Sequence, residues 1–269
     1  MNQITIFRIA FCYILLLFTF SLSAQNINDL LFNNYHLTFQ TGYLNNQIQQ
    51  KGNTNEQGYF IINAKKGGFV GGTLTINPFK NLGLEVGTNI SLQTFGYDVE
   101  LKASEFGIEN NFNRKQNIPE IYAEVPLAVV PRFQINEKNW LYARLGMTMS
   151  WFSPLEINFN LDSNPQNPDK NEALGEVQMR FNANNPYFSA LTGIGLQRLT
   201  KNKDLIGLSL NTTFGFSNIL EGNYIIWDDE VIVNSGSFSS KGNYISLVFA
   251  YTFTGVKKLE QEINKIRID

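Results

Sequence analysis

The sequence predicts an all-β protein, an eight-stranded antiparallel up-and-down transmembrane β-barrel. Three observations lead to this fold class. Eight segments alternate apolar and polar residues with a period of two, as half-buried strands do. The connections between these segments are short and long in strict alternation. After residue 24 no apolar run approaches the roughly 18 residues that a membrane-spanning helix needs, so a helical membrane protein is not expected.

The chain begins with a segment that has the order of a secretory signal peptide. Arg8 and the amino terminus supply positive charge, Ile9–Phe20 is a mostly apolar run, and Ser21–Ala24 precedes Gln25. The apolar run is too short to cross a bilayer as a helix. We therefore predict a cleaved signal peptide over residues 1–24 and an exported mature chain.

Removal of this segment leaves an acidic chain without cysteine. The only cysteine, Cys12, lies inside the apolar run. The alternative that Cys12 carries a lipid anchor is disfavoured because bulky Phe11 stands where a small residue is expected. The formal net charge is −2 for the whole chain and becomes −3 without Arg8, so no nucleic-acid partner is predicted.

The first four segments with alternating residues have the length of tilted membrane-crossing strands. Tyr35–Tyr43 alternates aromatic and aliphatic residues with polar ones, and Val70–Pro78 sets leucine and isoleucine against threonine and asparagine. Leu84–Gln93 is the clearest, because a shift of one residue would turn Glu85 into lipid. Glu120–Phe133 keeps its alternation although two prolines interrupt its hydrogen-bond donors.

The last four segments complete the set. Leu141–Trp151 opposes leucine and methionine to polar residues, while Tyr187–Leu196 is weaker because Leu191 breaks the pattern. Ile206–Phe216 opposes aliphatic and aromatic residues to glycine, serine, asparagine and threonine. Tyr244–Phe253 ends the series with an aromatic-rich apolar face. Eight is the smallest common even number of strands in outer-membrane barrels.

The connections predict which ends of the strands face the periplasm. Three are short and turn-like: Phe79–Gly83, Gln134–Trp140 and Leu199–Asp204. Four are long and rich in asparagine, glycine and serine: Leu44–Gly68, Thr94–Asn117, Phe152–Pro186 and Ser217–Gly242. Tight periplasmic turns and mobile outer loops are typical of membrane barrels. We therefore predict one outer-membrane β-barrel domain over residues 25–253 and a charged periplasmic C-terminal tail over residues 254–269.

Six polar residues on the third, fourth and fifth strands are predicted to face the barrel lumen: Glu85, Glu120, Glu124, Arg132, Tyr142 and Arg144. An eight-stranded barrel is just wide enough to be filled by its own side chains. Because an unpaired buried charge costs several kcal/mol, these groups need partners. We expect a structural Glu/Arg network that fixes strand register. An ion or proton path through the same residues is the alternative.

Catalytic, cofactor and metal sites are not predicted. The only histidine, His36, is expected to face the lumen at the periplasmic start of the first strand, where a structural role is favoured over a general base. No phosphate loop or nucleophile elbow is present. Acidic residues in two long connections could attract calcium, but their spacing matches no known calcium loop: Asp162, Asp169, Glu172, Asp228, Asp229 and Glu230.

Aromatic residues gather near the predicted strand ends, where amphipathic rings suit the lipid headgroup level. They are Tyr35, Tyr43, Phe79, Phe133, Trp151, Phe216, Tyr251 and Phe253. Their placement predicts anchorage in outer-membrane lipid.

Three stretches resemble the outer-membrane β-barrel domain family of the Bacteroidota, the porin-family or PorT-like proteins. Tyr122–Leu127 places a glutamate and a proline inside an apolar run, Tyr244–Phe253 resembles an aromatic-ended last strand, and Ser23–Gln25 is similar to that lineage's signal ends. The resemblance implies an outer-membrane location, recognition of the last strand by the barrel assembly machinery, and contact with envelope or secretion proteins. The chain departs from the pattern because residues follow Phe253.

Four functions compete at this point. A structural or interaction role, in the envelope or in export, is favoured. Porin-like passage of small solutes is the first alternative. A soluble exported barrel for a lipophilic ligand would need apolar residues inside and polar residues outside. An outer-membrane enzyme is the least favoured, and we predict no enzymatic activity.

Overall fold

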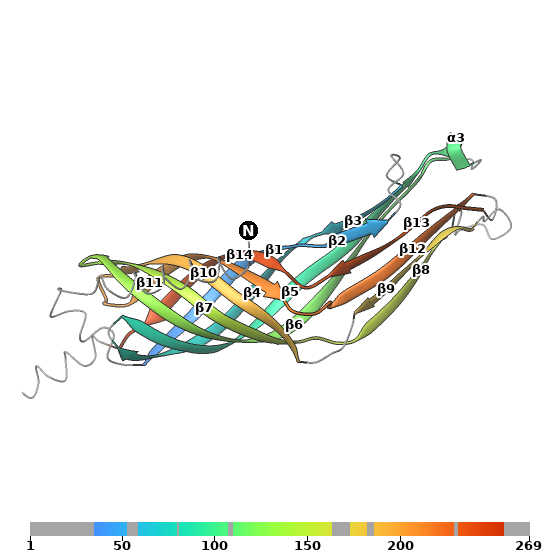
Figure 1. Cartoon of the computed structure of the whole chain (residues 1–269). Coiled ribbons are helices and arrows are strands. Elements are labelled where there is room, and N and C mark those ends of the chain that lie inside the picture. Colours follow the sequence, from blue (N-terminus) through green and yellow to red (C-terminus); the bar gives the residue numbers. More distant parts are fainter. Residues whose placement is uncertain are drawn as a thin grey trace, which may run out of the picture.

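The computed structural model describes residues 35–52, 59–79, 81–106, 110–162, 173–181, 186–228 and 231–255. Nearly all of them lie in β-strands (Figure 1). The predicted signal peptide and all but the first two residues of the predicted tail lie outside these ranges. Within the ranges, no helix is both long enough and apolar enough to cross a membrane.

Eight antiparallel strands form a closed ring. In chain order they are β1 (His36–Asn46), β4 (Lys66–Phe79), β5 (Leu82–Leu101), β6 (Phe112–Asn136), β7 (Asn139–Trp151), β10 (Tyr187–Leu199), β11 (Leu205–Gly215) and β14 (Tyr244–Phe253). Each pairs with the ring strands before and after it in the chain, and the pairing of β1 with β14 completes the circle. All eight predicted segments are ring strands, so the predicted antiparallel up-and-down barrel is confirmed.

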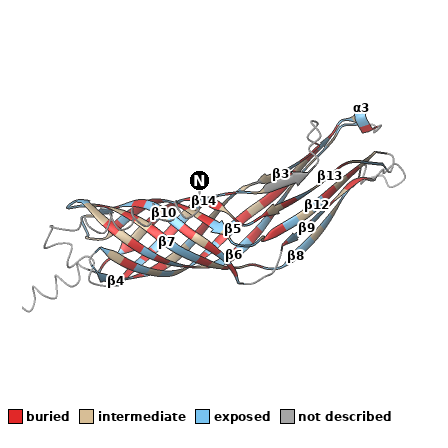
Figure 2. Cartoon of the chain, viewed as in Figure 1, coloured by how far each residue is buried: buried red, intermediate tan, exposed pale blue. Residues whose placement is uncertain are grey.

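The outer surface of the ring is apolar and its interior is polar. Figure 2 shows buried and exposed residues alternating along the ring strands. Exposed apolar residues cover the outside as a belt: Leu37, Phe39, Val70, Leu74, Val86, Ile90, Leu127, Leu145, Ile194, Leu208, Leu247 and Phe249. Buried polar residues face inward: Thr38, Thr73, Asn89, Ser91, Thr148, Ser189, Ser209, Asn211, Ser246 and Thr252. A soluble barrel with an apolar interior is therefore contradicted, and lipid is the solvent that suits this belt.

The long strand β5 exchanges the character of its two faces partway along its length. As far as Gln93 its inward residues are polar, whereas its last four inward residues are aromatic or aliphatic and fully buried: Phe95, Tyr97, Val99 and Leu101. Its outward face changes in the opposite sense, from Leu92 to Asp98. Side-chain alternation continues unbroken. The exchange therefore marks the level at which lipid outside the barrel gives way to water.

The remaining elements build an ordered extension beyond that level (Figure 1). They are β2 (Gln49–Gly52), β3 (Phe60–Ala64), the short helix α3 (Ala103–Phe106), β8 (Leu155–Asp162), β9 (Ala173–Phe181), β12 (Leu220–Asp228) and β13 (Val231–Ser240). A second sheet has the order β2-β13-β12-β9-β8, while β3 pairs with the outer part of β5. The prediction of mobile loops is therefore wrong for the described parts of these four connections, whose backbones are paired in sheets.

An aromatic core joins the two sheets of the extension. The ring of Phe60 on β3 stacks on Tyr97 of β5, with 5.6 Å between ring centroids. Its neighbours on the opposite sheet are Tyr224 of β12 at 4.1 Å and Phe238 of β13 at 6.0 Å. Aromatic rings remove large apolar areas from water. This core explains why segments rich in asparagine, glycine and serine are ordered.

Two glycines let the aromatic rings lie across neighbouring backbones. Gly222 of β12 is paired with Phe238 of β13, and Gly236 of β13 is paired with Tyr224 of β12. A Cβ on Gly222 would overlap the Phe238 ring, and one on Gly236 would lie 2.7 Å from the Tyr224 ring. A ring that covers a paired glycine helps to fix strand register.

The apolar belt leads to a first prediction. Leu208 on β11 is half-exposed and pairs with apolar belt residues on both neighbouring strands. Because arginine at the bilayer midplane costs about 2–4 kcal/mol, Leu208→Arg should lower the free energy of unfolding from lipid vesicles by about that amount. Asn113→Arg, on the water-exposed outward face of β6, should change it by less than about 0.5 kcal/mol. Equal effects of the two variants would contradict the placement of the membrane.

Candidate functional site

Four of the six predicted lumen residues meet in the half of the barrel whose strands are joined by the short turns. The side chains of Glu85, Arg132, Tyr142 and Arg144 line one small space of about 20 Å³. The Arg144 guanidinium donates a hydrogen bond to the Glu85 carboxylate, and Arg132 Nη1 donates to Asn77 Oδ1 at 2.7 Å. Glu85 and Arg144 are almost completely buried, at 11% and 6% side-chain exposure, so the pair is shielded from bulk water.

The other two predicted lumen residues lie farther from the short turns. Glu124 is paired in register with Asn89 of β5 and Ser150 of β7. These positions are four residues from Glu85 and six from Arg144, or about 13 and 20 Å along the strands. Glu120 lies on the same strand, two inward positions beyond Glu124, and both carboxyl groups belong to buried residues. The structure therefore separates these two glutamates from the other four predicted lumen residues.

Other lumen contacts involve residues that were expected on polar strand faces but not at a site. Gln40 Nε2 of β1 donates to Asn89 Oδ1 of β5 at 2.9 Å. The hydroxyls of Thr38 and Thr252 share a hydrogen bond at 2.8 Å between β1 and β14. The period-two pattern placed all four side chains inward. It gave no signal for which inward groups would touch.

The structure places His36 as predicted. It is the first residue of β1, faces the interior and is buried, in register with Thr75 of β4. Across the described ranges, no group of three or more histidine, cysteine, aspartate and glutamate residues could hold a metal ion. Of the acidic residues weighed for calcium, only Asp162 and Asp228 lie in those ranges.

Arg114 links the two sheets of the extension where β6 passes β8. Its Nη1 donates to the backbone carbonyl of Asn160 at 2.7 Å, and its guanidinium lies 6.0 Å from the centre of the Phe159 ring. Burial raises the pKa of the nearby Tyr97 phenol, and the positive charge of Arg114 opposes this rise. The link therefore combines a charged hydrogen bond with an aromatic contact.

The far end of the extension holds a small polar cluster. Tyr59 Oη donates to Glu105 Oε2 at 2.9 Å, and Lys102 Nζ lies 3.2 Å from Glu105 Oε1. The hydrogen bond from Tyr59, followed by that from Lys102, lowers the pKa of the Glu105 carboxyl. These contacts tie α3 to the start of β3.

The last strand is held at its C-terminal end by the turn between β10 and β11. Tyr251 Oη donates to Asp204 Oδ2 at 2.8 Å, and the backbone N–H of Thr254 donates to Asp204 Oδ1 at 3.3 Å. Thr254 Oγ1 also donates to the carbonyl of Lys203 at 2.6 Å. The turn between β10 and β11 therefore holds the point where the tail begins.

No family model matches this sequence, and no curated protein matches it either. Among solved structures the chain is similar to OprG from Pseudomonas aeruginosa, with 9% identity, a TM-score of 0.43, and coverage of 81% of this chain and 95% of that one. It is also similar to Ail of Yersinia pestis, with 15% identity, a TM-score of 0.31, and coverage of 81% and 98%. AlkL in DMPC lipid bilayers shows 8% identity, a TM-score of 0.38, and coverage of 87% and 95%.

These three neighbours are outer membrane proteins. The assignment of this chain rests on its own geometry, namely a closed antiparallel ring, an apolar outer belt and a polar interior. Only a closed barrel satisfies every backbone group of β-strands in lipid. The chain is a transmembrane β-barrel protein.

Proposed function

We propose that this barrel serves as an interaction protein of the cell envelope and that its extension presents the binding surface. The carrying observation is the small free space that remains in the lumen at the level of the Glu85–Arg144 pair. The space enclosed by Glu85, Arg132, Tyr142 and Arg144 has a volume of about 20 Å³. That is room for about one water molecule. A lumen closed in this way favours a structural or binding role over passage of solutes.

The extension supports the same proposal. Its sheets bury an aromatic core that includes Phe60 and Phe238, and they turn polar faces to the surroundings. A rigid scaffold that holds polar side chains in fixed positions suits recognition, because little conformational entropy is lost on binding. The function therefore centres on the part of the chain beyond the lipid belt.

The resemblance to PorT-like proteins of the Bacteroidota suggests export or envelope maintenance as the process. Envelope or secretion proteins are the partners we propose, with outer-membrane lipid around the belt. Recognition by the barrel assembly machinery would use β14, which pairs with β1 and β11 on its two sides. We propose no enzymatic activity, cofactor or metal for this chain.

Planar-bilayer recording tests this function against porin-like passage. The refolded protein, checked by its heat-dependent mobility on SDS gels, should insert without stepwise conductance, because charged and polar side chains occupy the lumen. A general porin in the same bilayers is the positive control. Steady unitary currents that scale with salt concentration would favour passage of small solutes and contradict the proposal.

A further inference from the structure

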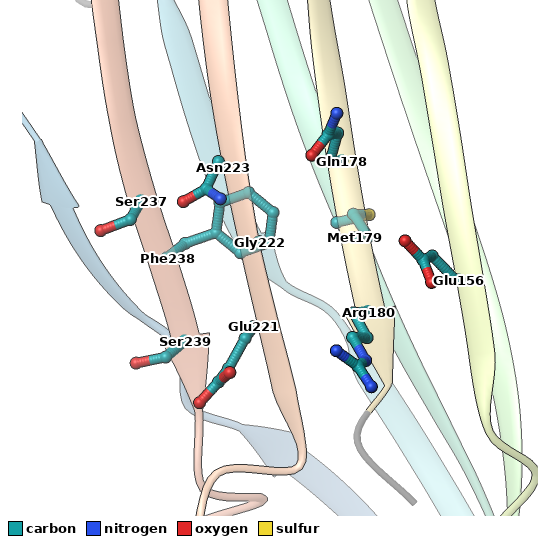
Figure 3. Close-up of a pocket in the computed structure, with 10 residues that line it drawn as sticks. All are labelled: Glu156, Gln178, Met179, Arg180, Glu221, Gly222, Asn223, Ser237, Phe238 and Ser239. Atoms are coloured by element: carbon teal, nitrogen blue, oxygen red, sulfur yellow. The ribbon is translucent and has the colours of Figure 1, made fainter.

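The extension carries a polar trough that lies outside the barrel ring. Its volume is about 520 Å³, and it lies on the sheet formed by β8, β9, β12 and β13 (Figure 3). Met179, Gly222 and Phe238 form part of its lining, with the two side chains almost fully buried. The exposed side chains that rise around it are polar and include Glu156, Gln178, Arg180, Glu221, Asn223 and Ser237. The aromatic core lies on the other face of the same sheet.

Strand register arranges these side chains in two rows. Arg180 of β9 is paired with Glu156 of β8 on one side and with Glu221 of β12 on the other. The second row, two residues along, contains Asn158, Gln178, Asn223 and Ser237. Neighbouring strands are about 4.8 Å apart and alternate residues about 7 Å apart, so the rows form a grid about 14 Å wide.

The chemistry of the grid selects among possible ligands. Amide, hydroxyl and carboxylate groups dominate, and a single cation, Arg180, lies between two carboxylates. Arg180 is exposed and lines the trough, so a ligand can reach it. The carboxylates disfavour an anionic ligand and Arg180 disfavours a cationic one. No apolar side chain of the two rows projects outward to receive an acyl chain, and a neutral ligand rich in hydroxyl groups suits these donors and acceptors.

The position of the trough identifies the source of such a ligand. β12 begins at Leu220, only four residues after Phe216, whose exposed ring marks the outer edge of the lipid belt. The row containing Arg180 is therefore the part of the sheet closest to the membrane. It faces away from the core, toward the surrounding lipid headgroups. In the outer leaflet of an outer membrane these headgroups carry sugar chains.

We propose that the trough binds the neutral sugar chain of a neighbouring outer-leaflet glycolipid through its hydroxyl groups. This inference rests on the proposed function, in that it names a partner class for the extension. Arg180 would donate to ring or hydroxyl oxygens, while Asn223 and Gln178 would both donate and accept. The carboxylates of Glu156 and Glu221 would accept hydrogen bonds from sugar hydroxyls.

The test uses the full protein in lipid nanodiscs and neutral O-polysaccharide released from lipopolysaccharide of the strain that encodes it. The unmodified protein should bind the polysaccharide at both low and high salt, because no net charge is neutralised. Arg180→Ala with Asn223→Ala should weaken binding at least about tenfold, since several hydrogen bonds are lost. Both positions are exposed, so the barrel should fold as before. Asn113→Ala, on the outward face of the other sheet, is the matched control and should not change binding.

Three results would overturn the inference. The first is no binding of the neutral polysaccharide, and the second is equal binding by the double variant. The third is binding only to deep-rough lipopolysaccharide, lost at high salt, which would indicate an anionic headgroup. The bilayer recordings separate these failures from failure of the proposed function. A non-conducting barrel that ignores the polysaccharide would retain the interaction role and lose this ligand.

Discussion

Removal of the Glu85 carboxylate is expected to destabilise the barrel by about 3–5 kcal/mol. Glu85 accepts a hydrogen bond from Arg144, and both side chains are almost fully shielded from water. In Glu85→Ala the guanidinium of Arg144 would remain inside the lumen without its counter-charge. The free energy of unfolding from lipid vesicles, followed by heat-dependent gel mobility in urea, measures the loss.

Two further variants test whether the unpaired charge of Arg144 causes this loss of stability. In Glu85→Leu with Arg144→Met the buried charges disappear together, and most of the stability should return, because well-packed apolar residues often replace a buried ion pair without loss. Glu100→Ala removes an exposed carboxylate from the outer part of the same strand and should cost less than about 0.5 kcal/mol. A small effect of Glu85→Ala, or a double variant as unstable as the single one, would show that the pair does not stabilise the barrel.

The ring could be predicted from the sequence because lipid imposes one constant rule on it. Each strand must turn apolar residues outward over its whole membrane-crossing length, so period-two alternation identifies the strand and its register. Leu191 of β10 interrupts the alternation in the sequence. In the structure it is buried inside the barrel, where it belongs to a small apolar cluster with Val130 and Tyr142. An irregular residue thus lies on the expected strand and face.

The extension was missed because the same alternation continues with its faces exchanged. Along β5 the apolar residues move from even positions such as Leu92 to odd positions such as Phe95. If each strand is expected to keep one lipid-facing side, its predicted end falls at this exchange, and the residues beyond are predicted to be loops. The signal was present in Phe95, Tyr97 and Val99, which alternate with less apolar residues. Recognising this signal requires the expectation that the surroundings of one strand change from lipid to water.

The inward direction of the lumen residues was predictable, but their contacts were not. Glu85 and Arg144 lie on β5 and β7, with β6 between them. Which inward residues meet across an intervening strand depends on two successive registers and on the stagger of the barrel. Period-two alternation in a sequence determines neither the registers nor the stagger. The same uncertainty explains why Glu120 and Glu124 were grouped with residues that lie at another level.

Truncation of the Phe60 ring should unfold the extension while leaving the barrel in place. Phe60 is 3% exposed and stacks against Tyr97, Tyr224 and Phe238, so it joins both sheets. Loss of a buried phenylalanine costs about 3–5 kcal/mol. Because the ring strands keep their lipid belt and lumen, Phe60→Ala should still show the heat-dependent gel shift of a closed barrel.

The loss can be assigned to the extension by following Trp227 of β12 alone, with Trp140 and Trp151 replaced by phenylalanine in every variant. Its fluorescence should report unfolding of Phe60→Ala at lower urea than the parent. Ile61→Ala changes the next residue of β3, which is half-exposed on the outward face, and should leave the transition nearly unchanged. If both variants shifted equally, the aromatic core would not be what orders the outer strands. If Phe60→Ala also abolished the gel shift, barrel and extension would form a single cooperative unit, in which lipid-facing and water-facing halves stabilise each other.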